Sequence, residues 1–185
     1  RSLIIFSMSS LRFFVEFAYF TYLPLFAISS LGVGVDRGGF LFTIFAIGAI
    51  ATASLVRMIS SRMGPMHSVT IGFGIQGVCL ISTCFVTSIW HLAPVLLIFG
   101  FANGVISPTQ KSLLTQSVRA ELRGGFVAAD RVAQNSAKFI SPLIAGFIAA
   151  LTSIPTMFLL LGLMTCLWAI TVSLFVLLNL IEKKD

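Results

Sequence analysis

The sequence predicts an all-α membrane protein with six transmembrane helices. Hydrophobic residues make up 57% of the 185-residue chain and charged residues 10%, against about 25% charged residues in an ordinary soluble domain. Runs such as 158–164 are apolar on every face, whereas a membrane-spanning β-strand alternates apolar and polar residues. Helices satisfy their backbone hydrogen bonds within the segment, as lipid requires. Composition and pattern therefore both favour a helical bundle in a bilayer.

Each long apolar run has the length needed to cross a membrane. A hydrocarbon core about 30 Å thick needs about 20 helical residues at about 1.5 Å rise per residue. The connections between the runs are short, so the spans form a single bundle over residues 1–185. In chain order, the predicted spans are 3–30, 38–59, 69–87, 92–114, 126–151 and 155–180.

The placement of the basic residues predicts the orientation of the bundle. With the N-terminus in the cytoplasm, only Arg37 falls on the outer side. Cytoplasmic loops carry an excess of Lys and Arg, so we expect both termini in the cytoplasm and the protein in the cell membrane. The net charge of +6 reports topology, and no nucleic-acid partner is expected. The residues on the cytoplasmic side are Arg1, Arg57, Arg62, Lys111, Arg119, Arg123, Lys183 and Lys184.

Neither a metal site nor a cofactor site is expected. The three cysteines, Cys79, Cys84 and Cys166, lie inside predicted spans without the histidine or carboxylate company of a metal centre. Residues 72–77 fit the string of a dinucleotide-binding loop, but that loop needs a preceding strand, and here the glycines lie inside a membrane helix. Small residues at such spacing allow close helix contacts in lipid.

The first span carries two opposite charges in its middle. A charge at the centre of a membrane helix costs about 2.5–3.5 kcal/mol on insertion scales. Arg12 and Glu16 are four residues apart and share a helix face, which Ser9 and Tyr19 continue. Two interpretations stay open: a neutralised pair that holds the bundle together, or part of a pathway for a solute.

The fourth and fifth spans carry the other polar residues. The second, third and sixth spans have no charge in their middles. We therefore expect the first, fourth and fifth spans to line a cavity, and the third and sixth to be peripheral. The polar residues are Asn103, Ser107 and Gln110 in the fourth span, and Asp130, Arg131, Gln134, Asn135 and Lys138 in the fifth.

The chain resembles one six-helix half of a major facilitator superfamily transporter. The first span ends in a Pro-containing segment at 22–26, followed by Leu31-Gly32. The loop at 57–66 is similar to the family's Gly-x-x-x-Asp-Arg-x-Gly-Arg-Arg signature: Arg62 and Gly64 match, whereas Arg57 replaces the first Gly and Ser61 replaces the Asp. Arg123-Gly124 and the Ser-Pro-x-x-Ala-Gly run at 141–146 resemble signals of the family's fifth helix. The altered loop and the charged ending at 182–185 favour the C-terminal half.

The resemblance implies secondary active transport of a small solute by alternating access, in which two halves rock around a site near the midplane. It implies a second six-helix half as partner, besides the lipid bilayer and a small-molecule substrate. Because Glu16 is the only predicted mid-membrane carboxylate, we expect it to couple transport to protons. The alternative is a non-transporting scaffold or accessory subunit, and no enzyme activity is expected. The expected pathway residues are Arg12, Glu16, Tyr19, Asn103, Gln110, Gln134 and Lys138, and the expected cytoplasmic gate consists of Arg57, Arg62, Gly64, Asp130 and Arg131.

Overall fold

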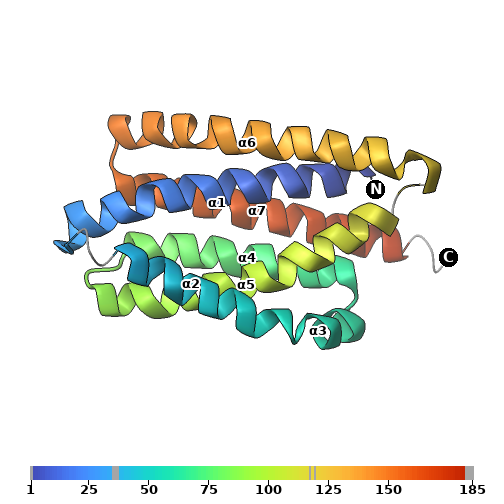
Figure 1. Ribbon diagram of the computed structural model, residues 1–185, viewed down its shortest axis with the longest axis horizontal. Coiled ribbons are helices and arrows are strands. Elements are labelled where there is room, and N and C mark those ends of the chain that lie inside the picture. Colours follow the sequence, from blue (N-terminus) through green and yellow to red (C-terminus); the bar gives the residue numbers. More distant parts are fainter. Residues whose placement is uncertain (1, 35–37, 117, 119, 182–185) are drawn as a thin grey trace.

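The computed structural model describes residues 2–34, 38–116, 118 and 120–181. This part of the chain folds into helices that run side by side along the long axis of the molecule (Figure 1). They are α1 (Ser2–Leu31), α2 (Gly38–Ala53), α3 (Val56–Met63), α4 (Pro65–Cys84), α5 (Ile89–Gln116), the 3₁₀ helix η2 (Ala120–Leu122), α6 (Arg123–Leu151) and α7 (Ile154–Ile181).

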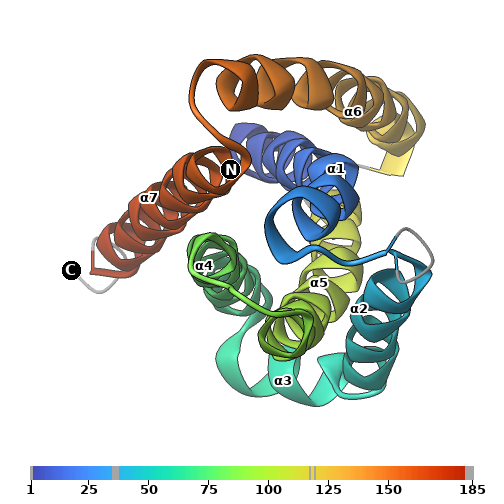
Figure 2. The ribbon, with the colours of Figure 1, turned by 90° about the vertical axis from the view of Figure 1, so that its left-hand side faces the viewer.

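Four helix pairs make the main contacts of the bundle. Helix α4 packs on both α5 and α7, α2 packs along α5, and α6 packs along α1. Seen from the end, α6 and α1 lie together on one side, while α4 and α5 lie between α7 and α2 (Figure 2). Helix α4 packs against α5 and α7, while Ile71, Ile75 and Val78 on its other side stay exposed, so the peripheral position that the sequence predicts for the third span stays a prediction.

The second predicted span, 38–59, is not one continuous helix. Helix α2 ends at Ala53 and α3 begins at Val56. Near the break, the Thr52 hydroxyl donates to the Gly48 carbonyl and the Ser54 hydroxyl to the Ala51 carbonyl, while the Leu55 amide bonds to Thr52 in a tighter turn. Side-chain hydroxyls that bond to backbone carbonyls compete with the regular helix ladder and often bend it.

Length and composition identify four helices as candidate membrane spans among the described residues. They are Phe6–Leu31, Pro65–Cys84, Ile89–Gln116 and Ile154–Val176. The apolar part of α2 is shorter, Gly38–Thr52, and α6 carries the polar residues of the fifth predicted span. Six transmembrane helices thus stay a prediction. Helices α4, α5 and α6, which correspond to the third, fourth and fifth predicted spans, begin earlier than expected, at Pro65, Ile89 and Arg123.

The core has two parts that lie at different depths of the bundle. A large aromatic cluster includes Tyr19, Phe26, Phe99 and Phe158, all fully or almost fully buried. A smaller cluster gathers around Phe73 and its neighbours on α4, α5 and α7. Outward-facing apolar side chains of α6, such as Phe139 at 75% exposure, are typical of a surface that lies against lipid or another protein.

Candidate functional site

The expected Arg12–Glu16 pair forms inside the bundle. Arg12 Nε lies 3.4 Å from Glu16 Oε2, and the two side chains are only 8% and 16% exposed. The pair results from the spacing of four residues, which places both side chains on one face of α1. A charge buried at this depth is costly unless it is paired, so each residue lowers the free-energy cost of burying the other.

Helix α5 provides a further hydrogen-bond partner for Arg12. Arg12 Nη1 donates to Gln110 Oε1 at 3.3 Å, and Gln110 Nε2 donates to Ser9 Oγ at 3.1 Å. Ser9, Arg12 and Gln110 are all buried. A charged group and an amide therefore link α1 to α5 through a short hydrogen-bonded chain, which fixes the guanidinium between Glu16 and the fourth span.

Helix α6 brings a second carboxylate to the same region. Asp130 is only 3% exposed, accepts a hydrogen bond from Gln134 Nε2 at 2.5 Å, and lies within electrostatic range of the Arg12 guanidinium. Among the described residues, the ion pair within contact distance is Arg12–Glu16 and not Arg62–Asp130. Asp130 therefore belongs with the buried polar residues in this conformation, although the sequence placed it in the cytoplasmic gate.

The other expected gate residues that the structure describes lie on the surface or in a turn. Arg62 and Arg131 are exposed. Gly64 separates α3 from α4 with a φ of +81°, a backbone conformation that favours glycine. The side chain of Arg57 lies outside the part of the chain that the structure describes. The gate thus stays a prediction.

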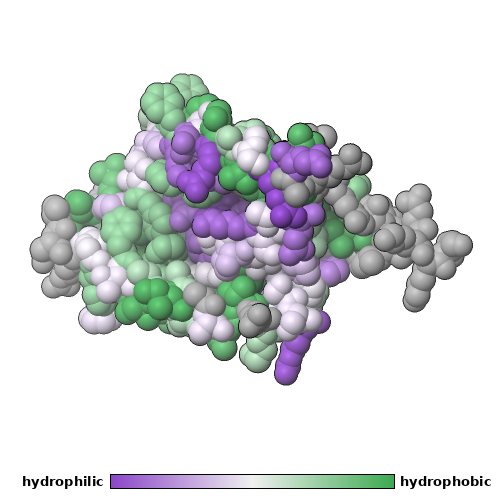
Figure 3. All heavy atoms as spheres, turned by 45° about the vertical axis from the view of Figure 1, so that its right-hand side comes forward, coloured by the Kyte–Doolittle hydropathy of each residue, from purple (hydrophilic) through white to green (hydrophobic). Residues whose placement is uncertain are grey.

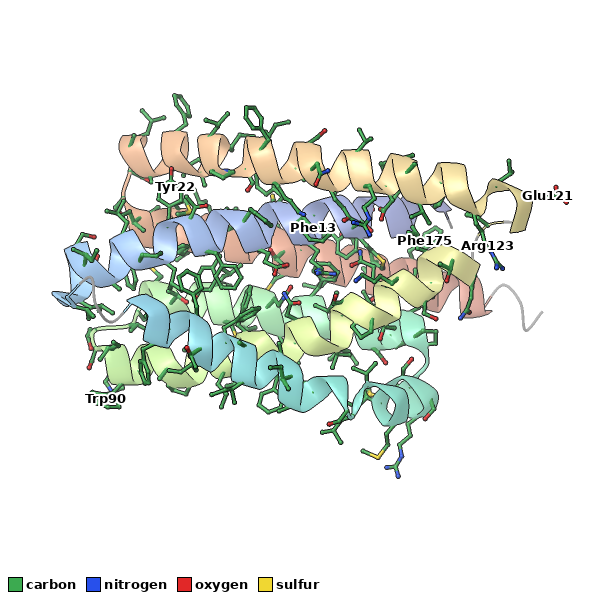
Figure 4. The ribbon with its side chains drawn as sticks, viewed as in Figure 1. Phe13, Tyr22, Trp90, Glu121, Arg123 and Phe175 are labelled. Carbon is green, nitrogen blue, oxygen red and sulfur yellow. The ribbon has the colours of Figure 1, made fainter. Side chains whose placement is uncertain are left out.

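Lys138 contacts aromatic rings instead of a carboxylate. Its ammonium lies 4.5 Å from the centroid of the Phe13 ring and 5.2 Å from that of Phe17, which is within the range of cation–π attraction. The Arg12 guanidinium lies 4.5 Å from the same Phe13 ring. Phe13 is near mid-length of the bundle, far from Trp90 at one end and from Glu121 and Arg123 at the other (Figure 4).

Several buried polar atoms in this region lack a hydrogen-bond partner within the described residues. An unpaired polar atom away from water costs about 1–3 kcal/mol, so such atoms mark a place that water or a ligand reaches in some state. Figure 3 shows hydrophilic surface gathered around a hollow on one face of the molecule. The atoms are Asn103 Nδ2, Asp130 Oδ1 and Ser141 Oγ, besides Arg12 Nε and Glu16 Oε2, which face each other in the ion pair.

Tyr19 lies in the core and not on the polar face. It is fully buried, its hydroxyl shares a 3.0 Å hydrogen bond with Thr83 on α4, and its ring packs against Phe99 and Phe158. The face of α1 that carries Ser9, Arg12 and Tyr19 therefore has charged neighbours near Arg12 and aromatic neighbours near Tyr19. We leave Tyr19 out of the proposed pathway.

The sequence analysis missed Phe13 and Phe17 as functional candidates. Their signal was present, since Phe13 follows Arg12 and Phe17 follows Glu16, four residues apart. The chain has 18 phenylalanines, and this spacing alone does not distinguish Phe13 and Phe17 from phenylalanines that face lipid. The distinction also requires the position of Lys138.

A comparison with protein families identifies the family of the chain. The model of the Major Facilitator Superfamily matches residues 3–185, and no curated protein matches the chain. The match covers almost the whole sequence and includes all the helices described above. The chain is an integral, multi-pass membrane protein that belongs to the Major Facilitator Superfamily, a family of membrane transporters.

Proposed function

We propose that the chain forms half of a secondary active transporter, which moves a small solute across the cell membrane by alternating access and is driven by protons. The observation that carries this proposal is the buried Arg12–Glu16 pair on α1, which lies close to the buried Gln110 on α5 and Asp130 on α6. Intramembrane ionisable residues that face the interior of a bundle are typical of substrate and proton pathways.

Glu16 is the proposed proton carrier. While it is ionised, it holds the Arg12 guanidinium on α1. Protonation of Glu16 removes that attraction. Arg12 then keeps its hydrogen bond to Gln110 on α5 and its electrostatic attraction to Asp130 on α6. Because Arg12 contacts Glu16 on α1 and Gln110 on α5 and lies in the field of Asp130 on α6, a single proton changes the balance of forces among these helices. A ligand or proton shifts a conformational equilibrium by its differential affinity for the two states.

The proposal includes a second six-helix half and cytoplasmic termini. Helix α6 packs mainly along α1, and several of its apolar side chains are exposed, including Val132 at 67% and Phe147 at 68%. A second half packed against this side would enclose a site near the midplane between two bundles, as transporters built from repeats do. The orientation rests on the positive-inside distribution of Lys and Arg.

Currents on proteoliposomes test the proton coupling. The chain is reconstituted together with its second six-helix half, adsorbed on a solid-supported membrane, and exposed to a panel of amphipathic solutes one at a time under a pH gradient. We expect a solute-dependent current with the unchanged protein, loss of that current in Glu16→Gln, and an unchanged current in Glu121→Gln, which removes an exposed carboxylate in η2. A full current in Glu16→Gln rejects Glu16 as the proton carrier. A protein that gives no current with any solute favours the scaffold alternative.

A further inference from the structure

Lys138 is a cation without an anionic partner in the region that the structure describes. It is half-buried on α6, it makes no ion pair there, and its ammonium rests on the rings of Phe13 and Phe17. Lysine ammonium groups are strongly hydrated, and aromatic faces replace only part of that hydration. The group is therefore held in place but not neutralised.

The Phe13 ring lies beside two cations, and only one of them has a carboxylate in contact. The Arg12 guanidinium and the Lys138 ammonium each lie 4.5 Å from the Phe13 centroid, so they are at most 9 Å apart. Glu16 neutralises Arg12. Asp130 lies two helical turns from Lys138 along α6 and is bound by Gln134. Of the two cations, Lys138 is therefore the one that has no carboxylate in contact among the described residues.

We propose that Lys138 is the anchor for a carboxylate of the transported solute, and that Phe13 and Phe17 bind its apolar body. The solute class is a small organic monoanion with a flat apolar part. When it binds, the ammonium moves from the ring faces to the carboxylate, and the ring faces that it leaves pack against the body of the solute. This inference rests on the proposed transport function and names its substrate class.

The same charges argue against other solute classes. A dianion would bring its second negative charge close to Glu16 and Asp130, and like charges at short range cost free energy in a medium of low dielectric constant. A cationic solute would have to displace Lys138 from the rings and then remain close to both Lys138 and Arg12. A neutral solute would leave the ammonium unpaired.

Binding of benzoate tests the anchor without requiring transport. Saturation-transfer NMR on the protein in lipid nanodiscs, with empty nanodiscs as the blank, compares four probes of similar size: benzoate, uncharged benzamide, cationic benzylamine and dianionic phthalate. We expect benzoate to bind at least tenfold more tightly than the other three. Lys138→Gln should weaken benzoate binding at least tenfold, Lys138→Arg should retain most of it, and Phe17→Leu should weaken binding of benzoate while leaving the charge in place.

Arg123→Gln is the matched control, because Arg123 is an exposed cation at the start of the same helix, and we expect this variant to bind benzoate as the unchanged protein does. Equal binding of benzoate and benzamide, tighter binding of benzylamine, or undiminished binding in Lys138→Gln each overturns the anchor. If Lys138→Gln does not fold, the ranking of the four probes on the unchanged protein decides. Benzoate binding without any proton-driven current would reject the transport function and retain the anchor, whereas currents with other solutes and no benzoate binding would reject the anchor alone.

Discussion

The α2–α5 and α4–α7 interfaces are dry and closely packed through glycines, whereas the α1–α6 side of the bundle carries the charges. A Cβ on Gly100 would overlap the backbone carbonyl of Phe45, and one on Gly77 would meet Cys166 and the Gly162 carbonyl. In lipid, small residues let helix backbones approach and gain packing energy. The α1–α6 side, by contrast, carries the charged groups of Arg12, Asp130 and Lys138 inside the bundle or against its aromatic rings. One side of the molecule is therefore suited to stay fixed, and the other to respond to protons and solutes.

Loss of one member of the buried charge pair should have the largest effect on the free energy of unfolding. Arg12→Met leaves Glu16 buried without its cation, and breaking a buried pair in this way costs about 3–5 kcal/mol. The double variant Arg12→Met with Glu16→Leu removes both charges and should recover most of that stability. Unfolding titrations in mixed micelles measure both effects.

Activity separates the two interpretations of the pair. If Arg12 and Glu16 form part of the pathway, the double variant should fold and be inactive in the current measurement. A double variant that is both stable and fully active would show that the pair serves only to hold the bundle together.

Overpacking of the dry side should come next. Gly100→Ala places a methyl group against the Phe45 carbonyl and the Ala49 amide of α2, so the two backbones must move apart. Overpacking of this kind typically costs about 1–3 kcal/mol. Gly74→Ala is the matched control, because a Cβ there meets nothing within 4 Å. Equal unfolding free energies of the two variants would contradict the close packing of α2 on α5.

Removal of the Tyr19 hydroxyl should have a smaller effect, on stability only. Tyr19→Phe keeps the ring contacts with Phe99 and Phe158 and loses the hydrogen bond to Thr83, which still donates to the Cys79 carbonyl. A typical hydrogen bond contributes about 1 kcal/mol. Currents should remain unchanged, because Tyr19 lies in the core. A loss of current with unchanged stability would return Tyr19 to the pathway.

Asp130→Asn should have the smallest effect, on the balance between inward-open and outward-open states. The amide oxygen can still accept from Gln134, but the charge near Arg12 is lost. We expect a shift toward the inward-open state of about 1 kcal/mol or less, the usual range for weak ion-pair terms. Distances between spin labels on the two halves measure it. Arg62→Gln should produce the same shift if Arg62 pairs with Asp130 in the opposite state, and a swap of the two charges should then reverse it.

Hydropathy and spacing predicted much of the fold, and contacts between helices account for what they missed. Span lengths predicted the helices because lipid leaves few alternatives, and the spacing of four residues predicted the Arg12–Glu16 pair, which the structure confirms. The break at Ser54 depends on hydroxyl-to-carbonyl bonds that an apolar run does not reveal. Gln110 as the partner of Arg12, the core position of Tyr19, and the rings under Lys138 each require the relative placement of two helices, and a single sequence does not contain that information.

Accessibility to water tests the contrast between the two regions most directly. In a protein whose native cysteines are replaced, Gln134→Cys on α6 and Thr165→Cys on α7 are treated in membranes with a small, charged thiol reagent. Gln134 is half-buried beside Asp130, whereas Thr165 is fully buried and bonds to the Leu161 carbonyl. We predict that Gln134→Cys reacts at least tenfold faster and that its rate changes when the pH gradient is reversed. Equal rates at the two positions, or a faster reaction at Thr165→Cys, would contradict a water-accessible pathway on the α1–α6 side.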